Sequence, residues 1–145
     1  MPAAAAEPIA TSSPLQVQQI DHVSVLITDV AKSRHFYRDL LGLKEMPKPK
    51  SFDFVALWFD LGPTQLHLLQ KEKPDSISPR HFALRVPDVN AVRKYLRERG
   101  VAFEETTVIP GADRVFVRDP DGNRIEIIHW AQPYGPHAYS AKLDQ

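Results

Sequence analysis

The sequence predicts an α+β fold made of two βαβββ modules of nearly equal length. Three observations lead to this fold class. The chain of 145 residues repeats itself at an offset of 59 positions, each copy opens with a strand-like alternation, and an amphipathic helical stretch follows it. A chain of this length, with 43% hydrophobic and 25% charged residues, suits a single globular domain.

The repeat is clearest where IDHVSVLITDV, starting at residue 20, is placed beside RHFALRVPDV, starting at residue 80. His22 then falls on His81, and the same offset places His67 on Glu126. A module of this length repeated once fills the middle of the chain and leaves no room for a separate linker domain. We therefore expect a disordered segment at 1–17, one domain made of modules 18–73 and 78–131, and an irregular tail at 132–145.

The first module is predicted to begin with a strand over 20–27, in which apolar residues recur at every second position. Asp29 stands where the N-cap of a helix belongs, and apolar spacing predicts a helix over 30–41. Gly42 has the place of a left-handed residue that ends a helix. Short strands and a turn at 60–63 complete the module.

The second module repeats this order with a strand over 80–86, a capping Asp88 and a helical stretch with apolar positions from 89 to 96. Gly100 then has the place of the left-handed residue that follows a helix. The sequence DPDG at 119–122 has proline at the second turn position and glycine at the fourth. That composition favours a type I turn before the last strand. This module is therefore also predicted to be βαβββ.

Alternation within the strands sorts the polar residues onto one face of each sheet. In the first and last strand of a module, one set of side chains packs against the helix and the other set lies on the helix-free face. That second face carries four candidate metal ligands: His22, His67, His81 and Glu126. It also carries four candidates for substrate binding: Ser24, Gln65, Arg85 and Arg124. Burying so many polar groups is costly unless they bind something.

A single histidine is more often structural than a metal ligand. Here, however, the two candidates within each module are separated by the same 45 residues, and imidazole or carboxylate occupies all four equivalent positions. Zn, Ni, Fe and Mn all accept such a set of nitrogen and oxygen donors. The histidines that do not follow this pattern are interpreted as structural: His35, His129 and His137. Trp58 and Phe116, at nearly matching repeat positions, are interpreted as core residues.

Composition limits the partners and the compartment. Lys+Arg and Asp+Glu both number 18, so nucleic acid and membrane are not expected partners, whereas a small molecule is. The chain has no cysteine, which excludes disulfides and thiolate chemistry and is compatible with a reducing compartment. The N-terminal stretch lacks the basic and apolar regions of a signal peptide, and no apolar run has membrane-spanning length. A cytoplasmic location is therefore expected.

Four stretches carry a resemblance to a known family: IDHVSVLITDVAKSRHFYRDLLGL, LGPTQLHLL, RHFALRVPDV and DRVFVRDPDGNRIEII. They resemble the vicinal oxygen chelate superfamily, which includes glyoxalase I, methylmalonyl-CoA epimerase, extradiol dioxygenases, fosfomycin-resistance thiol transferases and bleomycin-binding proteins. The stretch SFDFVALWFDLGPTQLHLLQ is similar to the small glyoxalase-I-like proteins of plants and bacteria. The resemblance covers about residues 19–130.

This resemblance implies that the two modules form an open half-barrel around a divalent metal. Ligands in the family come from the first and last strands of each module, and those positions here are His22, His67, His81 and Glu126. Many relatives are homodimers, so a homodimer is expected. A ligand-competent residue at position 67 favours the four-ligand branch of glyoxalase I and the epimerase, although those enzymes have Glu or Gln at that place.

The resemblance therefore implies a metal-dependent glyoxalase-like lyase/isomerase, with zinc or nickel favoured over iron or manganese. The reaction is proton transfer next to a carbonyl of a small α-oxo substrate or its thiol adduct, with Glu126 as the catalytic base. One alternative is an Fe(II) or Mn(II) extradiol-type dioxygenase that uses His22, His81 and Glu126 as its metal ligands. The other alternative is a non-enzymatic small-molecule-binding module of the bleomycin-resistance type.

Overall fold

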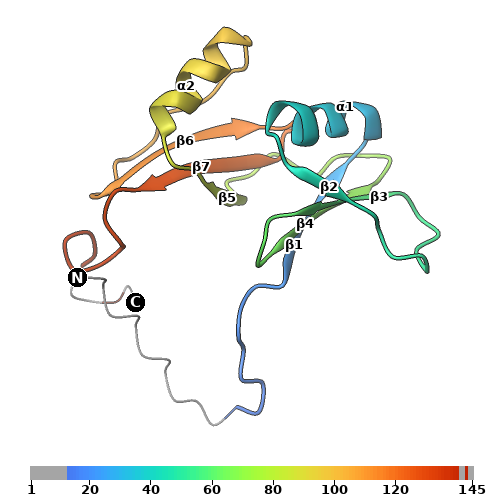
Figure 1. Ribbon diagram of the computed structural model, residues 1–145, viewed down its shortest axis with the longest axis horizontal. Coiled ribbons are helices and arrows are strands. Elements are labelled where there is room, and N and C mark those ends of the chain that lie inside the picture. The colour runs from blue at the N-terminus through green and yellow to red at the C-terminus, as the bar shows by residue number, and fades with distance from the viewer. Residues whose placement is uncertain (1–12, 141–142, 144–145) are drawn as a thin grey trace. The chain divides into compact units, whose positions relative to one another are not determined.

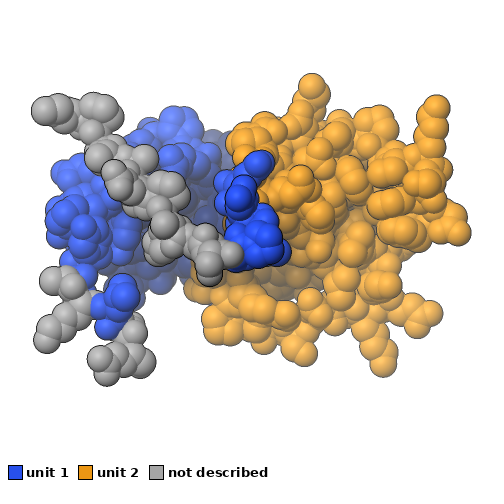
Figure 2. Space-filling view, turned by 90° about the horizontal axis from the view of Figure 1, so that it is seen from below, with its two compact units in different colours: residues 1–18, 83–117, 126–145 blue, residues 19–82, 118–125 orange. Residues whose placement is uncertain are grey.

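The computed structural model describes residues 13–140 and 143. The chain forms two compact units: unit 1 contains residues 1–18, 83–117 and 126–145, and unit 2 contains residues 19–82 and 118–125 (Figure 2). The segment predicted to be disordered lies outside the described residues as far as residue 12. In the tail, the described residues 132–140 contain no helix or strand. The module boundaries at 73 and 78 stay a prediction.

Unit 2 is built on a four-stranded sheet in the order β1-β4-β3-β2 (Figure 1). Its strands are β1 (His22–Ile27), β2 (Lys44–Met46), β3 (Ala56–Asp60) and β4 (Gln65–Gln70). β1 and β4 are parallel, whereas the other two pairs are antiparallel. The first module thus has the βαβββ order that its sequence predicts.

The helical segment of unit 2 consists of α1 (Val30–Arg34) and the π-helix η1 (His35–Leu40). Asp29 caps α1 as predicted, because its carboxylate accepts a hydrogen bond from a first-turn N–H at 2.9 Å. The regular α-helix expected over 30–41 is thus α-helical only as far as Arg34 and π-helical from His35. A π-turn holds one residue more than an α-turn, and here it accompanies the burial of two adjacent rings, Phe36 and Tyr37.

The sheet of unit 2 has one face toward the helical segment and one face without it. On the first face Phe59 is fully buried, and its ring centroid lies 6.0 Å from that of Tyr37. Further buried residues of the sheet are Ile27, Leu57, Leu66 and Leu68. The register pairs His67 with Ser24 on one side and with Trp58 on the other, so these three side chains share the opposite face. Leu66 and Leu68 are thus separated from His67 as the alternation predicts, whereas the interpretation of Trp58 as a core residue is wrong, because Trp58 lies on the face of His67.

The second module carries a three-stranded sheet in the order β5-β7-β6 (Figure 1). Its elements are β5 (His81–Arg85), α2 (Val89–Glu98), β6 (Ala112–Arg118) and β7 (Arg124–Trp130). Asp88 caps α2 as predicted, accepting a hydrogen bond from a first-turn N–H at 3.1 Å. None of the helices in the described part of the chain has both the length and the apolar character needed to cross a membrane.

In the second module, the strand expected next after the helix is reduced to an isolated bridge. Glu104 pairs with Phe116 through two backbone hydrogen bonds of 2.8 and 2.9 Å. Pro110 cannot donate to a ladder, and Gly111 has a φ of +84°, which an extended strand does not adopt. These two residues separate the bridge segment from β6 and keep the pairing short.

A buried carboxylate organises the turn at 119–122. The turn closes as predicted, with its last N–H donating to its first carbonyl at 3.0 Å. Asp119 is 5% exposed and accepts a hydrogen bond from the hydroxyl of Tyr37 at 2.7 Å. Burial and the nearby Asp119 carboxylate raise the pKa of Tyr37 far above its usual value, so the hydroxyl stays a donor. Asn123 adds a hydrogen bond to the carbonyl of Leu26 at 2.7 Å, which ties the turn to β1.

Candidate functional site

β1 and β4 bring two of the four predicted metal ligands together on the helix-free face of unit 2. The register pairs His22 with Gln65 and Ser24 with His67, so the two histidines are diagonal neighbours on adjacent strands. Their imidazole rings are stacked, with centroids 4.2 Å apart and planes inclined by 23°. Their proximity follows from the predicted alternation, and their role as ligands stays a prediction.

His67 is the more enclosed of these two histidines. It is 6% exposed and lies between the ring of His22 and that of Trp58, whose centroid is 3.6 Å away. Its Nε2 lies 2.9 Å from Oε1 of Gln65. Burial, and after it the neighbouring His22, lower the pKa of His67 below its usual value. The ring is therefore neutral at pH 7, and the neutral imidazole is the form that coordinates metals.

His22 is oriented by the residue that precedes it. Its Nδ1 lies 2.7 Å from a carboxylate oxygen of Asp21, while 45% of the His22 side chain is exposed. A carboxylate on one ring nitrogen fixes the orientation of an imidazole and leaves the other nitrogen available to a metal. Sequence reasoning missed Asp21, although the Asp-His dipeptide was an available signal. Its counterpart in the repeat, before His81, is Arg80.

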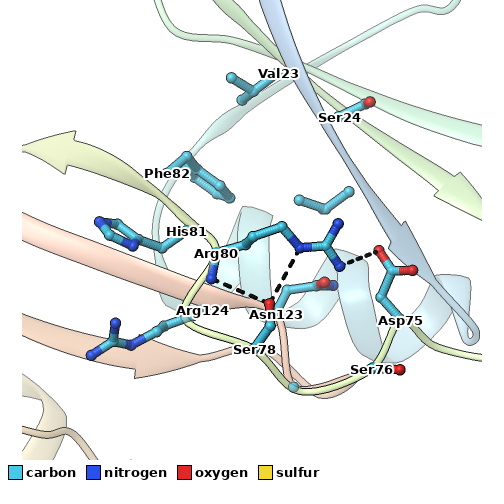
Figure 3. Close-up of a pocket in the computed structure, with 12 residues that line it drawn as sticks. Val23, Ser24, Asp75, Ser76, Ser78, Arg80, His81, Phe82, Asn123 and Arg124 are labelled. Carbon is cyan, nitrogen blue, oxygen red and sulfur yellow. Dashed lines mark hydrogen bonds and ion pairs between the residues drawn. The ribbon is translucent and has the colours of Figure 1, made fainter. Parts of the chain in front are cut away.

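A pocket of about 320 Å³ in unit 2 brings together three more of the predicted site residues: Ser24, His81 and Arg124 (Figure 3). β1, the first residues of β5, the start of β7 and the loop before β5 line it. His81 is exposed, and its Nδ1 lies 2.9 Å from the carbonyl oxygen of Pro79. The pocket thus combines a predicted ligand with two predicted substrate-binding residues.

Arg80 is a pocket residue that sequence reasoning missed. Its side chain extends between Ser78 and Asp75, as Figure 3 shows. Its Nε lies 3.2 Å from the Ser78 hydroxyl, and its Nη2 lies 3.7 Å from the Asp75 carboxylate. Guanidinium and hydroxyl groups on one wall suit a ligand that carries oxygen atoms.

Glu126, the fourth predicted ligand, lies on β7 within unit 1 and is 7% exposed. Its Oε1 accepts a hydrogen bond from Arg114 at 3.2 Å. Arg114 also donates to the carbonyl of Thr107 at 2.7 Å. Sequence reasoning missed this pair. The available signal was an arginine directly before the apolar residues Val115–Val117 of β6, because an enclosed guanidinium needs a partner of opposite charge.

No three or more His, Cys, Asp or Glu side chains are gathered as a ready metal site among the residues that the structure describes. The structure brings His22 and His67 together, whereas His81 lines the pocket and Glu126 pairs with Arg114. The residues nevertheless fit a divalent metal by their chemistry. His67 is a buried neutral imidazole, His22 is oriented by a carboxylate, and Glu126 is a buried carboxylate.

Comparison with known proteins identifies relatives of the chain. Residues 19–127 match the model of the glyoxalase/bleomycin resistance protein/dioxygenase superfamily. The chain is 32% identical over 126 residues to glyoxylase I 4 of Arabidopsis thaliana, a match that covers 79% of this chain and 72% of that protein.

Two solved structures extend the comparison to the fold. One is a Bacillus anthracis protein assigned to the glyoxalase family, with a TM-score of 0.73 and 28% identity over 79% of this chain and 96% of that one. The other is TnmS3, an antibiotic binding protein from Streptomyces sp. CB03234, with a TM-score of 0.67 and 26% identity over 79% and 98%. The predicted α+β fold of glyoxalase type is thereby confirmed. The chain belongs to the glyoxalase/bleomycin resistance protein/dioxygenase superfamily.

Proposed function

We propose that the protein is a divalent-metal-dependent, glyoxalase-like lyase/isomerase. It transfers a proton next to a carbonyl of a small α-oxo substrate or of its thiol adduct. The observation that carries this proposal is the pair of stacked imidazoles on the helix-free face of unit 2, His22 and His67. One of them is buried and neutral, and the other is oriented by Asp21, which are properties of metal-binding histidines.

In the proposed site, His81 and Glu126 complete the ligand set that begins with His22 and His67. Three imidazoles and one carboxylate suit zinc or nickel, and iron or manganese also accept them. A divalent metal held by these residues supplies Lewis acidity to the oxygen atoms of the substrate. We further propose a homodimer with one metal per chain, as in many relatives.

Glu126 is the proposed catalytic base, because it is the one carboxylate among the four ligands. A general base needs a carboxylate that is ionised and held in place. The hydrogen bond from Arg114 at 3.2 Å supports the second condition, because it fixes one oxygen of the carboxylate. Glu126 therefore takes the proton from the carbon next to the carbonyl and returns it to the neighbouring carbon.

Four polar residues are the proposed substrate contacts. Ser24 and Arg124 line the pocket beside His81, and Gln65 contacts His67. Arg85 is exposed on β5. Their hydroxyl, amide and guanidinium groups hold the substrate's oxygen atoms, which keeps the reacting carbon in a fixed position.

A second candidate is a small-molecule-binding module without catalysis. The ion pair between Glu126 and Arg114 favours it, because this pair satisfies a buried carboxylate without any metal. Similarity to an antibiotic binding protein supports the same class. In this case the polar pocket of unit 2 binds its ligand and releases it unchanged.

Metal content is the first test of the proposed function. Protein purified without chelator or affinity metal should contain one divalent ion per chain. His22→Ala, His81→Ala and Glu126→Ala should each lose most of it at neutral pH, because each removes one ligand. His35→Ala is the matched control, since His35 is an exposed imidazole on η1.

Full metal occupancy in all three site variants would overturn the ligand set. A metal-free wild type that binds small molecules but isomerises no hemithioacetal would favour the binding module. Oxygen consumption with a catechol, in place of isomerisation, would instead identify a dioxygenase.

A further inference from the structure

Five aromatic rings form a continuous row on unit 2. In order they are Phe54, Phe52, Trp58, His67 and His22. Consecutive ring centroids lie 4.7, 5.8, 3.6 and 4.2 Å apart. Three of the four contacts are stacked, and the contact between Phe52 and Trp58 is edge-on, with planes at 77°. One end of this ring row is therefore the pair of histidines proposed as metal ligands.

The other end of the ring row is exposed to solvent. Phe52 and Phe54 lie on the segment that connects β2 to β3, and Phe54 is 48% exposed. The segment is held in place, because Phe52 N donates to the carbonyl of Pro49 at 3.1 Å and the ammonium of Lys48 donates to the carbonyl of Phe54. Neighbouring apolar side chains that are exposed to solvent on a segment fixed by hydrogen bonds are typical of a binding surface.

The fold itself does not require aromatic rings at these positions. β3 sends Leu57 and Phe59 into the core, whereas Trp58 lies on the opposite face, paired with His67. Phe52 and Phe54 continue the row on that same side through Trp58, not through the core residues. The row thus extends the helix-free face outward from the two histidines.

We propose that this ring row is the wall that selects the substrate, and that the substrate carries an aromatic group beside its α-oxo group. The inference rests on the proposed function, which places the reacting end of the substrate at His22 and His67. An aromatic ring lying on Phe52 gains a stacking or edge contact in addition to the area that it buries. A methyl group in the same place has no π-face and covers less of the wall.

Two α-oxo acids that differ only in this group test the proposal: benzoylformate, with a phenyl group, and pyruvate, with a methyl group. Calorimetric titration should show that benzoylformate binds at least about tenfold more tightly than pyruvate. Phe52→Leu keeps the apolar bulk but removes the ring, and should weaken benzoylformate binding about fivefold while leaving pyruvate unchanged. Phe54→Leu, at a half-exposed position where folding is not at risk, should act in the same direction.

Tyr134→Leu is the matched control. Tyr134 is 60% exposed and lies in unit 1, where its ring centroid is 5.7 Å from that of Trp130. The variant therefore removes an exposed, paired aromatic ring that does not belong to the ring row. It should leave the affinity for both probes unchanged.

Tryptophan fluorescence locates the bound probe. The chain has two tryptophans, so Trp130→Phe leaves Trp58, in the middle of the ring row, as the reporter. Benzoylformate should change the emission of Trp58, and adding Phe52→Leu should shift this change to higher probe concentration.

Equal affinity for the two probes would overturn the proposal, and so would equal effects of Phe52→Leu and Tyr134→Leu. Failure of benzoylformate to bind, with and without added Zn²⁺, would overturn it as well. The phenyl preference is a difference between two probes that is measurable in metal-free protein. If the protein binds metal and isomerises substrate but shows no phenyl preference, the role of the ring row is contradicted and the proposed function is not. If the phenyl preference is present but the protein binds no metal, the proposed function is contradicted and the role of the ring row is not.

Discussion

Positions 67 and 126 occupy the same place in the two modules and are almost equally buried, yet their side chains are held in opposite ways. His67 lies between the rings of Trp58 and His22, and burial lowers its pKa so that it carries no charge. Glu126 is held by the guanidinium of Arg114 at 3.2 Å. One module thus buries a polar group by removing its charge, and the other by balancing it.

This difference separates what the two modules contribute. A neutral imidazole that loses a stacked neighbour loses packing, whereas a buried carboxylate that loses a guanidinium loses part of the balance of its charge. For the proposed chemistry, the same difference makes His67 a ligand and leaves proton transfer to Glu126. Substitutions in the two modules should therefore differ both in size and in kind.

The largest effect is expected from Glu126→Gln, which keeps the shape of the side chain but removes the base. Isomerisation of a hemithioacetal by the metal-loaded protein should fall by about 10²–10⁴-fold, the usual contribution of a general base. Steady-state kinetics measures this loss as a change in kcat. Glu104→Gln, at an exposed position of the second module, is the control and should leave kcat unchanged. Wild-type kcat in Glu126→Gln would move the role of base to another residue.

The next effect concerns stability and is expected from Arg114→Met. The substitution keeps an apolar stem but removes the guanidinium that donates to the buried Glu126 carboxylate. The free energy of unfolding at pH 7 should fall by about 3 kcal/mol, measured by urea denaturation. Adding Glu126→Gln should restore more than half of this loss, because the double variant has no carboxylate at position 126. A loss that the second substitution does not reduce would show that Arg114 acts through packing instead.

A smaller effect is expected from Trp58→Leu, which tests the ring stacking of the first module. Loss of the stacked ring should lower the free energy of unfolding by about 1–2 kcal/mol. In metal-free protein the pKa of His67 should rise toward its usual value, because burial is the main cause of its lowering. NMR titration of the imidazole resonances measures this change. Trp130→Leu removes the other tryptophan and should leave the His67 resonance unchanged; an equal shift there would contradict the local explanation.

Features that depend on local spacing were predictable from the sequence. The caps at Asp29 and Asp88 follow from a short polar residue placed before an apolar helical pattern. The proximity of His22 and His67 follows from two-residue alternation in strands that the repeat identifies as first and last. The π-helical half of the first helix could not be predicted, because it depends on how Phe36 and Tyr37 fit against the sheet.

The partners of the candidate site residues were harder to predict, because they depend on register across strands. The interpretation as a core residue is confirmed for Phe116, which is 3% exposed. Trp58, by contrast, is the cross-strand neighbour of His67 and lies on the same polar face. Arg114 lies on β6, outside the first and last strands on which the site residues were predicted, and its contact with Glu126 joins β6 to β7. Side-chain alternation indicates which face a residue occupies, but it does not indicate which residue of the neighbouring strand it meets.

The smallest expected effect comes from a second arginine of the same module, Arg93, whose carboxylate partners are exposed. Arg93 donates to Asp113 and Glu105 at distances of 2.7–3.0 Å, and these carboxylates are 43% and 59% exposed. Hydrogen bonds from Arg93 lower the pKa of both carboxyl groups. A carboxyl group with a lowered pKa stabilises the fold above its unfolded pKa, and this stabilisation is lost as the pH falls through the folded value. Arg93→Met should therefore lower the free energy of unfolding by only about 1 kcal/mol at pH 7, because solvent screens the charges. Its difference from wild type should start to shrink as the pH falls below about 4, where these carboxyl groups become protonated in the unfolded chain, and should continue to shrink as the pH falls through the lowered folded values. Urea denaturation at pH 7 and near pH 3 measures this change, with Lys94→Met as the exposed control. A loss close to that of Arg114→Met, or one that does not vary with pH, would contradict the contrast between the buried and the exposed pair.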